Sequence, residues 1–440
     1  MEKSRDLWKH KYLEHKSQIS KSLPIENSKA KHHSYPLIIV WFVVYLQSYG
    51  TMSLRCCQKS ITGMLIVMGL DMRTPSPTSI RTWCCKLGYY RVHNLSDVSG
   101  SWVLIVDESI TLNREKILLV LGVKLDQLPK GKSLTFSQVE VIRIEIHKKW
   151  KVEDITQLLE QIQQEREVVY VVSDQDHSLK KSYGLAGLDY ISDCTHLITA
   201  VLKNLYKNDS KFTEFASLAG RLRKTWCLSK YASYSPPNQR AKCRFANIFP
   251  VVEWAEQILN IWVTLPEELQ EKLVWLQEHK PFIEELILLT KWSKSILTVL
   301  KKGGYNNSKH KAIVKMMKGK QVGNALVFQN KVEQYLTQLN NYADQNNYEN
   351  LFCCSDIIES TFGKFKHKVN RNSTHGLTEF VLTIANFTGE LSMQEIKKGL
   401  ENTQIKDLNQ WKKERKKEGS IHKQKQEIFG KNWGKKSPQF

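Results

Sequence analysis

The sequence predicts an α/β fold that is interrupted by a large helical segment. Between residues 100 and 207, short runs rich in β-branched residues are flanked by polar residues and alternate with helical patterns. Between residues 208 and 348, apolar residues instead recur about every 3.6 positions, which indicates helices. The chain has 440 residues, more than one hydrophobic core usually holds, so we expect roughly two to four domains.

The N-terminal part divides into a leader and a small helical domain. Residues 1–34 are polar and rich in lysine and histidine, which indicates a flexible basic leader. Residues 35–95 contain three compact apolar stretches, and the last begins at Ser76, a residue type that caps helices, followed by a proline. This last helix carries Arg81 and Lys86, and with the helix before it has the outline of a DNA-binding helix-turn-helix. Packing of three helices around a shared core is the alternative interpretation.

Residues 100–207 carry the strand pattern. Strands are expected over residues 103–107, 117–124, 139–146, 168–173 and 188–192. The clearest of the intervening helices are expected over residues 152–166 and 195–206. The order β-β-β-α-β-α-β-α is that of the ribonuclease H-like fold, in which the first and fourth strands lie side by side.

The C-terminal half is predicted to be mainly helical. Residues 208–348 form an all-helical insertion, with helices expected over residues 251–263, 267–278, 282–300 and 325–343. Residues 349–393 are expected to return to the α/β core and to end in an apolar helix over residues 377–387. Residues 394–440 form a lysine-rich basic tail.

Three carboxylates occupy positions that suit metal binding. Asp107 ends the run Val-Leu-Ile-Val-Asp, and Asp174 ends the run Val-Val-Tyr-Val-Val-Ser-Asp. Glu359 lies far downstream on a predicted helix. A carboxylate at the end of a buried strand is unfavourable unless a cation meets it, and converging carboxylates suit divalent metal ions. Because the first and fourth strands are expected to be neighbours, Asp107 and Asp174 should reach the same metal pair.

Each of these acids has a neighbour that competes for its role. The side chain of Glu108 should point to the opposite face of its strand from Asp107. Asp176 lies beyond the end of the strand that precedes Asp174. Asp356 is one helical turn before Glu359 and shares its face, so it could support that glutamate, replace it as a ligand, or serve the helix dipole.

The composition favours a nucleic-acid partner. The chain has 65 Lys and Arg against 44 Asp and Glu, a net charge of +21, and basic proteins gain affinity for polyanions through counterion release. Two groups of basic residues outside the helix-turn-helix are candidate DNA contacts. The first lies in a loop and the second follows Glu359: Arg240, Lys242 and Arg244, and Lys364, Lys366, Lys368 and Arg371. A solvated charged helix end is the alternative for the second group.

The cysteines and the apolar run over residues 37–46 argue against export and membrane insertion. The nine cysteines form no CxxC motif and no even spacing, which indicates reduced thiols in a cytoplasmic protein rather than disulfides or a zinc knuckle. The apolar run is too short to cross a bilayer and predicts a buried helix. No membrane partner is expected.

These motifs together resemble those of bacterial insertion-sequence transposases of the DDE class. The resemblance covers nearly the whole chain, from the helix-turn-helix to the basic tail. It assigns the three acids to Asp107 in Val-Asp-Glu-Ser, Asp174 in Val-Ser-Asp-Gln-Asp, and Glu359 in Asp-Ile-Ile-Glu-Ser-Thr-Phe-Gly-Lys. The segment from Asp193 to His196, Asp-Cys-Thr-His, is similar to a short signature that follows the second acid in several transposase groups. We expect His196 to orient an acid rather than to bind metal.

The resemblance implies a DNA-processing enzyme. Two Mg²⁺ or Mn²⁺ ions held by the three acids would support cleavage at the terminal inverted repeats of a mobile element and joining of the ends to target DNA. Hard oxygen ligands, without a His or Cys set at metal-binding spacing, favour these ions over zinc. The enzyme would act on double-stranded DNA near the bacterial nucleoid, at least as a dimer. The alternatives are a ribonuclease H-like nuclease or resolvase that does not join ends, and a non-catalytic DNA-binding derivative of a transposase.

Overall fold

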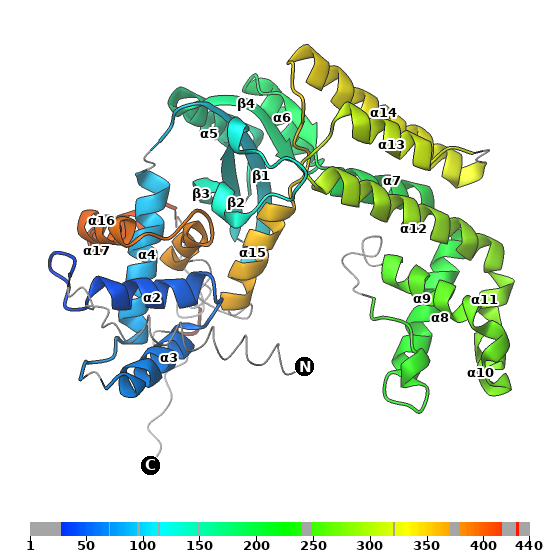
Figure 1. The fold of residues 1–440 in the computed structure, drawn as a ribbon, viewed down its shortest axis with the longest axis horizontal. Coiled ribbons are helices and arrows are strands. Elements are labelled where there is room, and N and C mark those ends of the chain that lie inside the picture. Colours follow the sequence, from blue (N-terminus) through cyan, green and yellow to red (C-terminus); the bar gives the residue numbers. More distant parts are fainter. Residues whose placement is uncertain are drawn as a thin grey trace, which may run out of the picture.

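The protein is a mixed α/β protein built around one five-stranded sheet. The computed structural model describes residues 28–69, 71–94, 97–112, 115–147, 149–239, 248–319, 322–369, 378–415 and 428–430. The sheet lies between an N-terminal helical part, joined by the C-terminal helices, and a long helical insertion (Figure 1). Within these ranges, no helix combines the length and the apolar composition that crossing a membrane requires.

The sheet has the predicted order of elements. Its strands are β1 (Ser101–Leu112), β2 (Glu115–Lys124), β3 (Glu140–His147), β4 (Glu167–Ser173) and β5 (Tyr190–Ser192). They are arranged in the order β3-β2-β1-β4-β5. Pairing is antiparallel across β1, β2 and β3 and parallel across β1, β4 and β5. The prediction that the first and fourth strands are neighbours is therefore confirmed.

Strand β1 is longer than predicted, and the expectation that it stops at Asp107 is wrong. Its parallel pairing with β4 ends at the pair Val106–Ser173. Its antiparallel pairing with β2 continues, with Asp107 opposite Leu119, to the pair Leu112–Glu115. The strand persists because β2 still satisfies its backbone groups after β4 has ended.

Helices cover both faces of the sheet. Between the strands lie α5 (Val152–Glu165), α6 (His177–Leu185) and α7 (Cys194–Tyr206). Helices α5 and α6 pack on one face through an apolar cluster with the side chains of Trp102 and Leu104, and the stripe Leu158, Leu159 and Ile162 of α5 is buried as predicted. Alternate β1 residues such as Ile105 belong to the cluster on the other face, which includes α7 and α15 (Asp356–Lys368).

The N-terminal helices are packed against the end of the chain. They are α2 (Leu37–Ser48), α3 (Leu54–Val67) and α4 (Pro77–His93), and Ser76 caps α4 as predicted. Helix α4 contacts the 3₁₀ helix η6 (Glu379–Phe387), α16 (Met393–Asn402) and α17 (Ile405–Arg415). The approach is so close that a Cβ added to Gly88 would lie 2.1 Å from the Leu382 carbonyl oxygen. The predicted tail therefore begins with two packed helices.

The insertion is helical, as predicted, with more helices than expected. It contains α8 (Ser210–Trp226), α9 (Ile248–Asn260), α10 (Glu267–Leu273), α11 (Trp275–Glu278), α12 (Lys280–Lys301), α13 (Asn307–Met316) and α14 (Gly323–Gln345). Short 3₁₀ helices η1 (Leu125–Gln127), η2 (Phe136–Gln138), η3 (Ala232–Tyr234) and η5 (Trp262–Thr264) lie in loops of the core and the insertion. Helix α12 connects the sheet side to α8–α11 at the far end (Figure 1), and α14 leads back toward α15.

Candidate active site

Asp107 and Asp174 lie next to each other at one edge of the parallel half of the sheet. Val106 and Ser173 are paired across β1 and β4, and the two aspartates are the residues that follow them. The Asp174 carboxylate accepts a hydrogen bond of 3.0 Å from the backbone N–H of Asp176, which fixes its orientation. The topology thus brings together two acids that are separated by three strands and a helix in the sequence.

The electrostatics of Asp107 reveal a concentration of negative charge. Burial, with smaller contributions from the carboxylates of Asp174 and Glu359, raises the pKa of Asp107 to about 7, although the Glu108 N–H and His196 act in the opposite direction. A carboxylate that is both partly desolvated and close to two others is poorly stabilised as an anion. The site therefore favours a bound cation when all three acids are ionised.

Glu359 is held at this edge by a histidine. It lies in the first turn of α15, and its Oε1 is 3.4 Å from Nε2 of His196 on α7. The other ring nitrogen of His196, Nδ1, is 3.0 Å from Oδ1 of Asp193. The hydrogen bond to Asp193 raises the pKa of His196 to about 9, with further contributions from the charges of Asp193 and Glu359, so the imidazole is a cation at neutral pH.

The buried Asp193 holds His196 and the start of α15 in place. Its side chain is fully buried and caps α7 by accepting a 2.7 Å hydrogen bond from the His196 N–H. Its second oxygen accepts a 2.6 Å bond from the N–H of Ser355, the residue before α15. Burial alone would raise the pKa of Asp193, but hydrogen bonds from His196 and Ser355 hold it below its usual value. A carboxylate–imidazolium–carboxylate chain therefore links α7 to α15.

The three competing acids have other partners. Glu108 forms an ion pair with Lys116 on β2. Asp176 caps α6 by accepting bonds of 2.8 and 3.2 Å from the first N–H groups of that helix. Asp356 forms a 2.6 Å ion pair with Lys301 and accepts a 3.2 Å bond from Thr195. These contacts give each competing acid a partner within the protein.

Asp107, Asp174 and Glu359 do not form a closed set of metal ligands in the part of the chain that the structure describes. In the described ranges, only one set of three His, Cys, Asp or Glu ligand atoms lies within 4.8 Å of one another, and it consists of Asp193, Cys194 and Cys354. The spacing of Asp107, Asp174 and Glu359 is therefore wider than a closed ligand cage.

The structure does not place Arg81 and Lys86 on an open DNA-reading surface. Arg81 forms a 2.7 Å ion pair with Glu379, and Lys86 donates a 3.1 Å hydrogen bond to the Leu400 carbonyl oxygen. Burial lowers the pKa of Lys86. The prediction that this helix enters the major groove disagrees with these contacts, because η6 and α16 cover the α4 face that carries both side chains.

The lysines that follow Glu359 also contact other groups of the protein. The Lys364 ammonium lies 3.4 Å from the centre of the Phe136 ring, and burial lowers its pKa. Lys368 donates to the Gln47 carbonyl oxygen at the end of α2, and burial lowers its pKa to about 7. Lys366 lies over the Phe362 ring at 5.9 Å. The predicted phosphate contacts Arg240, Lys242, Arg244 and Arg371 lie outside the described residues.

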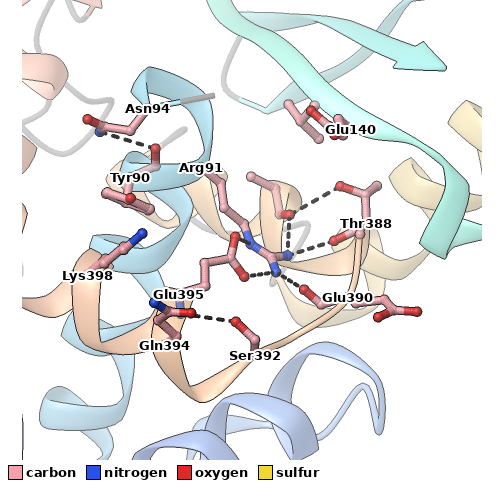
Figure 2. A pocket seen from close by; sticks show the side chains of 13 residues that line it. Tyr90, Arg91, Asn94, Glu140, Thr388, Glu390, Ser392, Gln394, Glu395 and Lys398 are labelled. Atoms are coloured by element: carbon pink, nitrogen blue, oxygen red, sulfur yellow. Dashed lines mark hydrogen bonds and ion pairs between the residues drawn. The ribbon is translucent and has the colours of Figure 1, made fainter. Parts of the chain in front are cut away.

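Arg91 is a structurally important residue that sequence reasoning missed. Its guanidinium donates to the Glu395 carboxylate at 2.5 and 2.9 Å and to the carbonyl oxygens of Ala385, Thr388 and Glu390 at 2.6–3.1 Å (Figure 2). It borders a cavity of about 380 Å³ that Lys398 also lines. All of these acceptors belong to the C-terminal segment, so this arginine holds α4 against that segment. Its only sequence signal is a basic residue in the last turn of a helix.

The sequence matches no protein-family model and no curated protein. The likeness to DDE transposases therefore depends on the motifs around Asp107, Asp174 and Glu359 and on the geometry that brings these acids together.

Proposed function

We propose that this protein is a metal-dependent DNA transposase of the DDE type with a ribonuclease H-like core. The observation that carries the proposal is the convergence of Asp107 and Asp174, from adjacent parallel strands, with Glu359 from the distant helix α15. The strand order β3-β2-β1-β4-β5, antiparallel on one side of β1 and parallel on the other, supports the ribonuclease H-like assignment.

The acids and the histidine have separate tasks in this proposal. Two bound Mg²⁺ or Mn²⁺ ions would supply activation of the attacking hydroxyl and stabilisation of the leaving oxygen. Asp107, Asp174 and Glu359 would hold these ions, and would bind them best when Asp107 is ionised. His196 positions Glu359 through its 3.4 Å contact and is itself fixed by the buried Asp193. The helix caps and ion pairs that the neighbouring acids form keep the surrounding helices in place.

The substrate in this proposal is double-stranded DNA, namely the inverted repeats of a mobile element and a target duplex. The net charge of +21 supports a polyanionic partner. Joining two element ends requires two active sites, so the working form is at least a dimer on DNA. Such an enzyme would act at the bacterial nucleoid.

The covered position of α4 favours a second candidate function. Arg81 and Lys86 are engaged by Glu379 and Leu400, so the two side chains that should read base edges already have partners within the protein. A nuclease or resolvase of the ribonuclease H-like type that recognises the shape of its nucleic acid needs no such helix. It would cut with the same acids without joining the ends.

The test is a cleavage and strand-transfer assay in Mg²⁺ with labelled DNA from the ends of the element that encodes the chain. We expect nicking and joined product from the wild type, and loss of both in Asp107→Asn, Asp174→Asn and Glu359→Gln. The matched controls are Glu108→Gln and Asp176→Asn, which alter the adjacent acids and should keep activity.

The outcomes of this assay distinguish the transposase from the alternative functions. Cutting without joining by the wild type would support the nuclease. Binding of the ends without any cutting would support a non-catalytic derivative. Equal activity in Asp107→Asn and Glu108→Gln would refute the assignment of the acids.

A further inference from the structure

A second cluster of metal-ligand groups lies beneath the candidate active site. Asp193 and Cys194, at the start of α7, meet Cys354, in the segment that leads into α15, and their ligand atoms all lie within 4.8 Å of one another. The three residues are 0%, 0% and 6% exposed, respectively. Cys194 and Cys354 are far apart in the sequence, so no motif spacing predicts their meeting.

The dimensions and donor atoms of this cluster suit zinc. In a tetrahedral site with Zn–S bonds near 2.3 Å, two sulfur ligands are about 3.8 Å apart, so the two thiols need to approach each other by at most about 1 Å. Thiolates bind zinc and select against Mg²⁺, whereas the acids of the active site do the opposite. The two clusters therefore differ in chemistry as well as in position.

A further thiol, that of Cys353, lies next to the cluster but outside the set of ligand atoms that are all within 4.8 Å of one another. The thiol of Cys353 is buried and interacts with that of Cys194. Four protein ligands without an open position are typical of structural zinc sites, while catalytic sites keep one position for water. The buried location of the cluster is consistent with a structural zinc site.

We propose that Asp193, Cys194 and Cys354, with Cys353 in the fourth position, form a structural Zn²⁺ site. Binding replaces the thiol protons, which are released to solvent, by the metal ion. The site joins the start of α7 to the segment that leads into α15, and it therefore fixes the two helices that carry His196 and Glu359.

The backbone around the cluster is already organised for such a site. The N–H of Cys194 donates a 2.9 Å hydrogen bond to the Cys353 carbonyl oxygen, which aligns the two segments. Asp193 accepts hydrogen bonds from His196 and Ser355. Carboxylates that bind metals are commonly held by such outer hydrogen bonds, which set the orientation of the ligand.

The experiment measures metal content directly in the full-length chain. We expect elemental analysis of protein from zinc-supplemented cells to find about one zinc per chain, in line with one four-coordinate site. We expect Co²⁺, exchanged for zinc, to give the thiolate-to-cobalt charge-transfer absorption of a cysteine site. Cys194→Ser and Cys354→Ser should lose this absorption. The matched control is Cys57→Ser, which alters a fully buried cysteine in the N-terminal helices.

The absence of both zinc and the cobalt absorption in the wild type would overturn the proposal, and so would their retention in Cys194→Ser and Cys354→Ser. The wild-type measurement decides the matter even if the serine variants fail to fold. Asp107→Asn should keep its zinc, and loss of zinc there would place the ion at the acids instead. None of these measurements requires DNA cleavage, so the zinc site can fail while the proposed function stands, and the reverse.

Discussion

Val106 and Ser173 form the last residue pair between the parallel strands β1 and β4, and an aspartate follows each of them. Asp107 remains in the sheet because β2 continues beside it, while Asp174 leaves the sheet at the end of β4. One aspartate is therefore fixed by the sheet and the other by the turn that follows. This difference matters because a rigid acid in a partly buried position cannot move away from its charged neighbours.

We predict that Asp107→Asn stabilises the metal-free protein above pH 7. Burial and Asp174 raise the pKa of Asp107 from 3.8 to about 7, so the folded state binds more protons than the unfolded state between these values. Stability from this group therefore falls as the pH rises through that window, and the loss is complete above about pH 7. Urea unfolding at pH 8 with a chelator should show a gain on the order of 2 kcal/mol.

The control for this prediction is Glu108→Gln, since Glu108 has Lys116 as a partner and should show no such gain. Added Mg²⁺ should raise the unfolding temperature of the wild type more than that of Asp107→Asn, because binding to the folded state alone stabilises it. A less stable Asp107→Asn at pH 8 would contradict the crowded-acid interpretation.

We predict that His196→Gln destabilises the protein at neutral pH. The change leaves the buried Asp193 without its cationic partner, while the N–H groups of His196 and Ser355 remain. The expected cost is about 1–3 kcal/mol, below the value for a fully buried pair, because the His196 side chain is 37% exposed and solvent screens the pair.

The pH dependence distinguishes charge from packing at this residue. The pKa of His196 is raised from 6.5 to about 9, so its stabilising contribution is fully present below pH 6.5 and is lost as the pH rises through about 9. The difference between wild type and His196→Gln, measured by thermal unfolding, should shrink between pH 7 and pH 10. The exposed His177 provides the control His177→Gln, with no expected change. A constant difference would indicate lost packing alone.

We predict that Arg91→Lys destabilises the contact between α4 and the C-terminal segment. A lysine cannot reproduce the planar set of donors that serves Glu395 and three backbone carbonyl oxygens, and its loss leaves some of them without partners. We expect a cost of about 2–3 kcal/mol in urea unfolding. Arg73→Lys, at an exposed position, should be neutral. Equal stability of both variants would argue against this role of Arg91.

We predict opposite effects for two glycine-to-alanine changes in helices. Gly88→Ala should cost at least about 1–3 kcal/mol, because its Cβ would overlap the backbone at Leu382. Gly63→Ala, on the exposed face of α3 with nothing within 4 Å, should stabilise by about 0.5–1 kcal/mol. Thermal unfolding of the two variants provides the comparison, and a tolerated alanine at position 88 would mean that α4 and η6 can separate.

Much of the fold was predictable because it follows local patterns. The buried stripe of α5 and the Ser76 cap of α4 each depend on residues that lie close together in the sequence, and the structure confirms both. The long predicted helix over residues 267–278 is instead two helices that meet near Val274. Its periodicity continues across the break, because the apolar pattern reports which side faces the core and not whether the backbone is continuous.

The candidate acids were predictable for a similar reason. Parallel neighbours bring the ends of their strands to one edge, so the strand order was sufficient to pair Asp107 with Asp174. The sequence also favoured these acids over Glu108, Asp176 and Asp356, and the structure adds that each of the three neighbours has a partner within the protein. Those partners come from other elements or from the next helix turn, and the sequence does not reveal which acids are already satisfied.

The sequence by itself determined the periodicity of the helices and strands and their order, because backbone geometry imposes these patterns locally. Only the tertiary structure decided the roles of the charged and thiol side chains. Arg81 meets Thr378 from 297 residues away, and Cys194 meets Cys354 across the whole insertion. Such partners are set by which surfaces pack together, and this depends on the burial of whole elements rather than on spacing along the chain.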